Sequence, residues 1–329
     1  MKSLKAQLWL GVALTTLTPG CGSDTLPAYT VLQGLRIVGL VLDQPEINFD
    51  GTSFTPNTVN ITPIVSDLYG GGRSLTYKLY HCLDPGVGLG AVPTCTGNPT
   101  RTDVSTGTAF DVTSGLGTFS APNATGDIGS INIPLNSAPL IALYSAIFSN
   151  LSTARKFNGT SILIFFELFP TGEESKKITV FKRLVFSGPA KATKNQNPAP
   201  GSLAFRQNGA VITSLPTAES QVEAFVPSSE NESYQEMSST GSLSTLTETI
   251  ETIWFLTGPE DVECSNTDTC TTDGLFERIR TVPGELNLFK PPKVAIPTTR
   301  GRILIGIAKD NRGGATFTRL CDGAGGLCP

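Results

Sequence analysis

The sequence contains few of the residues that most often carry chemistry in proteins. His81 is the only histidine among 329 residues, so a Ser-His-Asp triad would have to use it, and no Gly-x-Ser-x-Gly nucleophile elbow occurs. No Cys-x-x-Cys pair is present either, which argues against a zinc site built on the cysteines. We therefore expect His81 to be structural, and we predict no catalytic residue, no metal and no cofactor.

Charged residues are also sparse and evenly spread. They make up 16% of the chain, and the formal net charge is −4. Neither lysines nor arginines form a dense patch, which argues against binding to nucleic acid or to an anionic membrane surface. Beyond the N-terminal segment, no apolar run is long enough to cross a bilayer. Membrane attachment would therefore have to depend on the N-terminus.

The N-terminal segment has the features of a bacterial lipoprotein signal. Two lysines precede an apolar stretch over residues 6–17, and a glycine comes directly before Cys21. We predict that residues 1–20 are a lipoprotein signal peptide, that Cys21 receives a diacylglycerol and a further palmitate-type chain, and that residues 21–31 form a tether. Thr18 stands where the usual pattern has leucine. The alternative is an ordinary signal peptide cut nearby, which would leave Cys21 as a free or paired thiol.

The other six cysteines fall into three pairs of near neighbours along the chain. An exported chain meets oxidising conditions, and short loops close more readily than long ones. We therefore predict disulfides between Cys82 and Cys95, Cys264 and Cys270, and Cys321 and Cys328. This scheme leaves Cys21 for the lipid.

Short runs of branched residues alternate with turn residues along the first half, as in antiparallel β-sandwiches. Apolar residues at three- and four-residue spacing predict one helix over residues 138–151. The expected strands of this half are 34–43, 53–67, 75–82, 129–133, 160–169 and 177–186.

A polar, proline-containing segment at 191–200 predicts a linker between two domains, 32–190 and 201–329. The second domain shows the same alternation, and each domain ends in an expected hairpin, the last one turning through residues 310–314. We predict a mainly β fold of tandem immunoglobulin-like antiparallel β-sandwiches, with one short helix in the first. The expected strands of the second domain are 201–205, 210–212, 221–225, 251–256, 302–309 and 315–321.

Three short motifs are spread over much of the chain. Residues 35–46 contain Leu-Arg, an apolar run and Gln-Pro-Glu, residues 64–67 are Ile-Val-Ser-Asp, and residues 310–314 are Asp-Asn-Arg-Gly-Gly. This combination resembles uncharacterised lipoproteins of predatory and social Gram-negative bacteria, of the myxobacterial and Bdellovibrio type, with Gln44 in place of their first proline. The resemblance implies tandem immunoglobulin-like domains on a lipid anchor, and it implies no catalytic residue.

A few side chains leave room for sugar chemistry. Glu173-Glu174 and Glu260-Asp261 could supply the two carboxylates of a glycosidase, although both pairs lie in expected turns, where carboxylates are ordinarily solvated. Trp254 could stack on a sugar ring. Because large apolar residues flank it in an expected strand, we favour a position in the core.

One loop resembles part of a calcium site. Asn266, Asp268 and Asp273 supply suitable oxygens, but the alternation of an EF-hand is missing. A loop closed by the predicted Cys264–Cys270 disulfide accounts for the segment without a metal.

Together these observations predict a non-catalytic, lipid-anchored protein of the cell envelope with a structural, adhesive or binding role. Gly22 stands where aspartate would retain a lipoprotein in the inner membrane, so we expect the outer membrane, facing either the periplasm or the outside. The expected partners are the membrane, through the lipid on Cys21, and another envelope or surface protein or a glycan. Two alternatives stay open: a carbohydrate-active or carbohydrate-binding lipoprotein, and an accessory subunit of an envelope secretion or motility complex.

Overall fold

The structure is a computed structural model, and it describes two large parts of the chain together with several shorter ones. Several sequence predictions lie outside the described residues, among them the signal peptide, Cys21, the Cys264–Cys270 pair and Cys328. The described ranges are 31–32, 34–67, 73–84, 86, 92–98, 100–109, 125–127, 129–257, 280–289 and 302–322.

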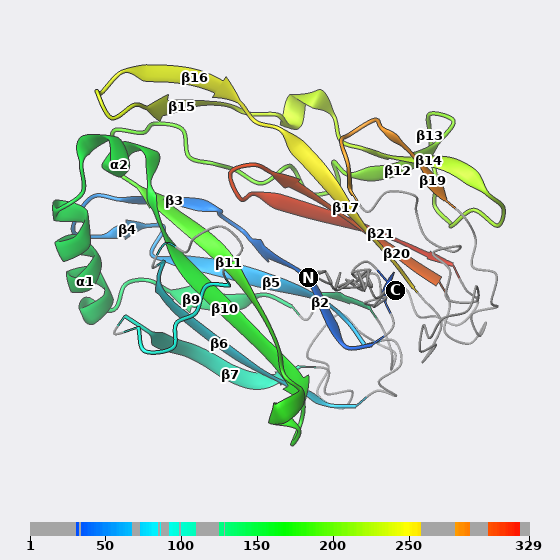
Figure 1. Ribbon diagram of the computed structural model, residues 1–329, viewed down its shortest axis with the longest axis horizontal. Helices are drawn as coiled ribbons and strands as arrows, with labels where there is room; N and C mark the ends of the chain where they lie inside the picture. Colours follow the sequence, from blue (N-terminus) through cyan, green and yellow to red (C-terminus); the bar gives the residue numbers. More distant parts are fainter. Residues whose placement is uncertain are drawn as a thin grey trace, which may run out of the picture.

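The fold is mainly β, as predicted, and its strands form four large sheets, which we number I to IV (Figure 1). Sheet I has the order β4-β3-β11-β10-β6-β7, with β3 (Glu46–Phe49), β4 (Phe54–Thr55), β6 (Leu75–Leu83), β7 (Thr102–Ala109), β10 (Thr160–Pro170) and β11 (Ile178–Ser187). Sheet II has the order β2-β5-β8, and β9 also pairs with β5; its strands are β2 (Arg36–Leu42), β5 (Thr58–Ser66), β8 (Thr125–Asp127) and β9 (Ile131–Pro134).

The second half of the chain supplies most of the other two sheets. Sheet III has the order β1-β17-β20-β21, with β18 also on β17; its strands are β1 (Val31–Leu32), β17 (Ile250–Thr257), β18 (Arg280–Thr281), β20 (Arg302–Asp310) and β21 (Ala315–Asp322). Sheet IV has the order β13-β12-β14-β19, with β12 (Ala204–Gln207), β13 (Ala210–Val211), β14 (Ser220–Phe225) and β19 (Leu286–Phe289).

A separate hairpin and four short helical segments complete the described elements. The hairpin consists of β15 (Ser233–Met237) and β16 (Leu243–Thr247). The predicted helix is confirmed as α1, and a second helix that we did not predict, α2, follows it. The segments are α1 (Ala138–Ser149), α2 (Thr153–Asn158), η1 (Glu174–Lys176) and η2 (Ser228–Glu230). Among the described residues, no helix has the length and apolar character needed to cross a membrane.

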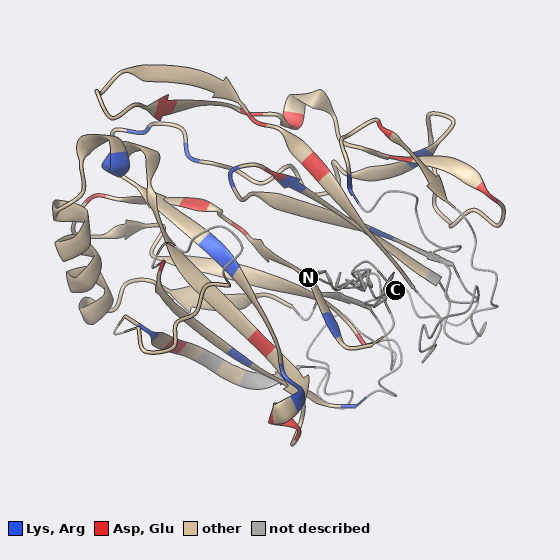
Figure 2. Cartoon of the chain, in the orientation of Figure 1, with Lys and Arg blue, Asp and Glu red and all other residues tan. Residues whose placement is uncertain are grey.

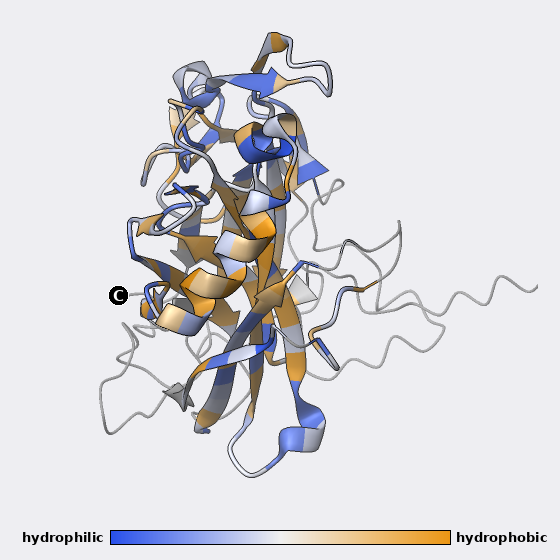
Figure 3. Cartoon of the chain, turned by 90° about the vertical axis from the view of Figure 1, so that its left-hand side faces the viewer, coloured by the Kyte–Doolittle hydropathy of each residue, from blue (hydrophilic) through white to orange (hydrophobic). Residues whose placement is uncertain are grey.

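Sheets I and II pack face to face to form the first sandwich. Their inner faces and one side of α1 bury a single apolar core, because alternate residues of each strand point to the same face. The core contains a cluster of aromatic rings in which Phe49, Phe54, Tyr144 and Phe186 contact one another at centroid distances of 4.5 to 5.9 Å. In Figure 3 the hydrophobic residues are concentrated along the stacked strands, and the turn at the bottom of the view is hydrophilic.

Sheets III and IV pack into the second sandwich. Trp254 of β17 lies at its centre, 1% exposed, with its ring 5.0 Å from that of Phe205 of β12. Gly306 of β20 lies beneath Phe205, and a Cβ added there would come within 2.7 Å of the phenylalanine ring. The absence of a side chain at Gly306 therefore lets the two sheets approach closely.

The two sandwiches also pack against each other, through the outer faces of sheets II and III. Val38 and Ile64 of sheet II share an apolar cluster with Phe255, Ile305 and other residues of sheet III. A Cβ on Gly39 would lie 2.6 Å from the end of the Ile307 side chain, so a larger residue here would require Ile307 to move. The four sheets therefore form one stack in the order I, II, III, IV.

The start of the described chain belongs to the second half of the molecule. Val31 and Leu32, at the predicted end of the tether and start of the first domain, pair in parallel with Leu256 and Thr257 of β17. Leu32 is fully buried in the cluster between sheets II and III. Burial of this one side chain explains why the strand joins sheet III.

Candidate functional site: the junction between the two halves

The segment that connects the two halves has no helix or strand, but it is held in place along its length. Asn197 joins both halves, because its Nδ2 donates to the Leu42 carbonyl oxygen over 2.6 Å and its Oδ1 accepts from the Ala315 amide over 2.9 Å. Lys191 and Asn195 are buried, at 6% and 1% exposure. The predicted linker is thus part of the contact between the halves.

Glu46, the first residue of β3, is the centre of a buried polar cluster at this contact. Its Oε1 accepts from Ser187 Oγ at 2.5 Å and from Lys191 Nζ at 2.7 Å. Its Oε2 accepts from the Asn195 amide at 3.0 Å and from Arg312 Nη2 at 2.8 Å. Donors from both halves and from the connecting segment therefore meet on one carboxylate that is 3% exposed.

Arg312 carries the cluster into the second half. Its guanidinium lies 2.8 Å from Glu46 and, through Nη1, 2.8 Å from Glu248 Oε1, and it lies over the ring of Tyr234, 4.4 Å from the centroid. Because a guanidinium presents several donors in one plane, a single arginine can serve two carboxylates. We call the set Glu46, Ser187, Lys191, Asn195, Glu248, Asp310 and Arg312 the polar junction.

The turn between β20 and β21 places Arg312. Asp310 Oδ1 accepts from the backbone amides of Arg312 at 2.7 Å and Gly314 at 2.9 Å, which closes the turn. A Cβ on Gly314 would clash with the Asp310 carboxylate and lie 2.5 Å from the Gln196 carbonyl oxygen. The Asp-x-Arg-Gly-Gly motif therefore has a physical role: Asp closes the turn, Arg reaches the other half, and the last Gly admits the connecting segment.

The two carboxylates that share Arg312 have pKa values shifted in opposite directions. For Glu46, burial alone would raise the pKa, but the donors from Lys191, Ser187 and Asn195 outweigh it and hold the pKa below the usual range. For Glu248, burial and the nearby charge of Asp310 outweigh the attraction of Arg312, and its pKa is raised to about 7. The polar junction thus contains one firmly ionised carboxylate and one that titrates near neutrality.

Two of the motifs quoted in the sequence analysis contain residues of this cluster. Glu46 is the last residue of the first motif, and Arg312 is the centre of the last one, 266 residues further on. The sequence alone gave no sign that they pair. The only signal was that each motif contains a charged residue next to proline or glycine.

His81 is buried within sheet I. It lies in β6 at 1% exposure, and burial lowers its pKa to about 4. Its Nδ1 has no hydrogen-bond partner within the described part of the chain. The geometry therefore places no serine and aspartate against it in the manner of a triad.

The acidic pair Glu173-Glu174 does not form two facing carboxylates. Glu173 pairs with Lys176, and Glu174 pairs with Lys78 Nζ at 2.5 Å, so each carboxylate has its own lysine at the exposed turn after β10. Glu260-Asp261 and the calcium-like residues Asn266, Asp268 and Asp273 lie outside the described residues. Among the described residues, no group of three or more potential ligands could hold a metal ion.

Trp254 occupies the core, as we favoured. Its indole Nε1 donates to Thr281 Oγ1 over 2.8 Å, which satisfies the one polar atom of the ring inside the sandwich. A ring that is 1% exposed offers no platform to a sugar. The sequence feature that most favoured the carbohydrate alternative is therefore used for packing.

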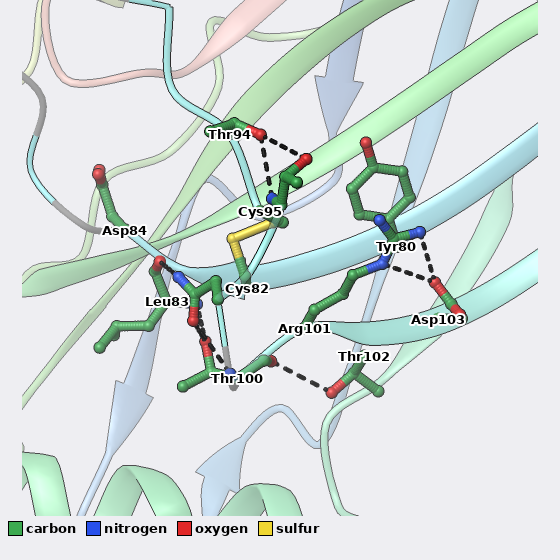
Figure 4. The surroundings of a disulfide bond; sticks show 12 residues. Tyr80, Cys82, Leu83, Asp84, Thr94, Cys95, Thr100, Arg101, Thr102 and Asp103 are labelled. Atoms are coloured by element: carbon green, nitrogen blue, oxygen red, sulfur yellow. Dashed lines mark hydrogen bonds and ion pairs between the residues drawn. A yellow bond between two sulfur atoms is a disulfide. The ribbon is translucent and has the colours of Figure 1, made fainter.

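The predicted Cys82–Cys95 disulfide is present and fastens a loop over the outer face of sheet I (Figure 4). Thr100 Oγ1 accepts from the Leu83 amide at 2.8 Å, which holds the same loop at its other end. Arg101 lies over the Tyr80 ring, 4.0 Å from its centroid, and pairs with Asp103. This arrangement covers apolar residues of β6 and β10, and its charges neutralise each other at the surface.

A groove of about 340 Å³ lies where sheets I, II and III meet. It is lined by Ile178 and Val180 of β11, Phe255 of β17 and residues 35–38. Apart from Arg36, these side chains are apolar, so the described lining lacks the converging polar groups that orient a small ligand. The polar junction is therefore the better candidate for a functional site, because its charged side chains come from both halves of the chain.

Neither a protein-family model nor a curated protein matches the chain. Among solved structures, it is similar to red sea bream transglutaminase with 11% identity and a TM-score of 0.20, covering 87% of this chain and 31% of that one. The periplasmic chaperone SfaE is 8% identical with a TM-score of 0.23, and the match covers 87% of this chain and 100% of that one. CBD12 from CALX1.2 is 6% identical with a TM-score of 0.20, and the match covers 81% of this chain and 79% of that one. The chain thus spans about a third of the transglutaminase. Likenesses at these TM-scores support no argument about function.

Proposed function

We propose that this chain is a non-catalytic, lipid-anchored protein of the cell envelope, attached to the outer membrane through Cys21, with a structural or binding role. The N-terminal sequence supports the lipid attachment, and the architecture supports the binding role. The proposed partner is another envelope or surface protein or a glycan.

The polar junction is the observation that carries the proposal. Buried charges that are fully paired add little net stability, but they cost several kcal/mol when one partner is missing. They therefore disfavour every arrangement of the two halves except the one that pairs Glu46 with Lys191 and Arg312. Fixing one arrangement serves a scaffold or binding platform, whereas domains joined by a free linker would change their relative orientation.

The distance from the anchor to the folded body supports the same role. Val31, where β1 begins, comes ten positions after Cys21, and a chain of this length spans at most about 36 Å. The stacked sheets would therefore stay close to the membrane surface. In the view of Figure 2, charged residues of both signs are dispersed over the described elements and do not gather into one basic cluster.

Replacement of the anchor residue tests the proposal. We expect the wild-type chain to take up an alkyne fatty acid in growing cells and to sediment with membranes. Cys21→Ser should take up no label and should accumulate as an unprocessed or soluble protein. Ser23→Ala is the matched control and should behave as wild type. Label that persists in the Cys21→Ser protein would refute lipid attachment at this residue.

A further inference from the structure

The β15–β16 hairpin stands apart from the four sheets, and the backbone groups at its two edges differ in their hydrogen-bond partners. It is a two-stranded sheet of its own, with β15 on the side of α2 and β16 at the outer margin of the molecule (Figure 1). All five residues of β16 are exposed, including Leu243 at 51% and Leu246 at 38%.

The ladder shows which backbone groups point outward. The Ser238 amide donates to Ser242, and the Glu248 amide donates to Glu232, so these pairs and every second pair between them are hydrogen-bonded. The N–H and C=O groups of Leu243, Thr245 and Thr247 must therefore point away from β15. Within the described part of the chain, no hydrogen bond ends on these groups.

On the opposite edge of the hairpin, formed by β15, a side chain bonds to outward-facing backbone groups. At Met237 of β15, the side-chain amide of Asn158 takes the place of a neighbouring strand: Asn158 Oδ1 accepts from the Met237 amide at 2.7 Å, and Nδ2 donates to its carbonyl at 2.8 Å. Asn158 is the last residue of α2. Asn158 thus occupies the β15 edge at Met237, whereas no side chain among the described residues does the same on the β16 edge.

We propose that β16 pairs edge to edge with β16 of a second copy of this chain, antiparallel and with Thr245 on the two-fold axis. This register places Leu243 opposite Thr247 of the second copy and Thr245 opposite its own counterpart. The three outward-facing residues of each chain would then exchange up to about six backbone hydrogen bonds. The product is a four-stranded sheet, which is more stable than the isolated hairpin.

The chemistry of the edge favours an identical partner. Residues 237–247 contain no charged side chain, so a symmetric pairing brings no like charges together, and a charged partner would find no counter-charge there. The strand also lacks proline and lysine, which commonly protect free edges. Threonine favours the β conformation, and threonines facing each other across strands can exchange a hydroxyl hydrogen bond.

Cysteine cross-linking tests both the contact and its register. All variants are full-length chains that carry Cys21→Ser, so the experiment does not depend on the lipid. Mild oxidation should convert Thr245→Cys to a disulfide-linked dimer, because directly paired residues have Cα atoms about 5.5 Å apart. Leu243→Cys mixed with Thr247→Cys should give the mixed dimer. Ser239→Cys, in the turn of the same hairpin, should stay monomeric, as should the Cys21→Ser parent.

Proline substitution separates dimer formation from folding. Thr245→Pro removes an outward N–H, which an edge strand tolerates, so the monomer should keep its melting temperature and lose the dimer in sedimentation. Leu246→Pro removes an N–H that bonds to β15 and should disrupt the hairpin itself. Monomeric sedimentation of the Cys21→Ser parent without Thr245→Cys cross-linking would overturn the proposal. Equal cross-linking of Ser239→Cys and Thr245→Cys, or pairing of this edge with a different protein only, would overturn it as well.

Discussion

The two sandwich cores and the junction between them are buried to a similar degree, but different interactions fill them. Sheets I and II, and sheets III and IV, bury aliphatic and aromatic side chains against each other. Between sheets II and III the apolar contact continues, but at its end lie five charged side chains. These are Glu46, Lys191, Glu248, Asp310 and Arg312, none more than 10% exposed.

The two kinds of interaction contribute differently to the folded state. Apolar burial supplies most of the free energy of folding and does not depend on ionisation. Buried ion pairs add little net free energy, because desolvation offsets their attraction, yet they penalise any arrangement that leaves one charge alone. The cores should therefore govern stability, and the junction should govern the relative arrangement of the halves and how stability responds to pH.

The largest expected effect is in a core. Trp254→Ala should lower the free energy of unfolding by about 3–5 kcal/mol, because it empties a large buried site and leaves Thr281 without its donor. Urea denaturation measures the loss, and the wild-type tryptophan should fluoresce in the blue and resist iodide. A freely quenched tryptophan in the folded protein would contradict the packing seen here.

Removal of the Glu46 carboxylate should lower the free energy of unfolding somewhat less than Trp254→Ala does. Glu46→Gln should lower the free energy of unfolding by about 3 kcal/mol, because Lys191 and Arg312 are left as buried charges without a full counter-charge. Glu174→Gln, which breaks an exposed pair with Lys78, is the control and should change stability by less than about 0.5 kcal/mol. Equal effects of the two substitutions would mean that the junction behaves like ordinary surface charge.

The Cys82–Cys95 disulfide belongs neither to a sandwich core nor to the polar junction, because it fastens a loop onto the outer face of sheet I. Replacing Cys82 and Cys95 by serine should cost about 2–3 kcal/mol, the value expected for closing a loop of this length. Peptide mapping without reductant should recover the two residues as one linked species. A bridge from either residue to the second half would disagree with the structure.

The smallest expected effect concerns pH. Burial raises the pKa of Glu248 to about 7 from 4.5. At pH values between 4.5 and 7, the folded protein therefore keeps a proton on Glu248 that the unfolded chain has released. The contribution of Glu248 to stability is therefore complete below pH 4.5 and declines as pH rises from 4.5 through 7. Screening by solvent reduces the effect of the full pKa shift to about 1–2 kcal/mol. Glu248→Gln should remove this decline.

Comparison with the Glu248→Gln variant is needed because His81 acts in the opposite direction. Burial lowers the pKa of His81 to about 4 from 6.5, so its contribution is complete above 6.5 and is lost as pH falls toward 4. Both proteins contain His81, so its contribution drops out when the free energy of unfolding of Glu248→Gln is subtracted from that of the wild type at each pH. A difference that grows in favour of wild type as pH rises would contradict the raised pKa.

Local sequence patterns predicted most of the buried strands and the main helix. Strands such as β10, β17 and β20 are rich in branched and aromatic residues, and their expected bounds agree with the structure to within about two residues. Among the strands that we missed, β16 has the least such signal. Residues of β16 are all exposed and are mostly serine and threonine, so neither burial nor alternation marks them.

The candidate site was predictable only in part. Residues 35–46 and 310–314 attracted attention as motifs, but their joint role depends on a contact between Glu46 and Arg312, far apart in the chain. The predicted linker shows the same limit. Its polarity and prolines indicated a connection between domains, but not that Lys191 and Asn195 would be buried in the contact.

What the sequence by itself determined is local. Side chains alternate along a strand, a thirteen-residue separation lets Cys82 meet Cys95, and Asp310 closes a turn on amides two and four residues away. Each of these depends on neighbours along the chain. Only the tertiary structure decided that sheet III is buried on both faces, that β1 crosses to the second half, and that Glu46 and Arg312 share a site. These contacts join distant segments, and their free energy exists only once the sheets have stacked and excluded water.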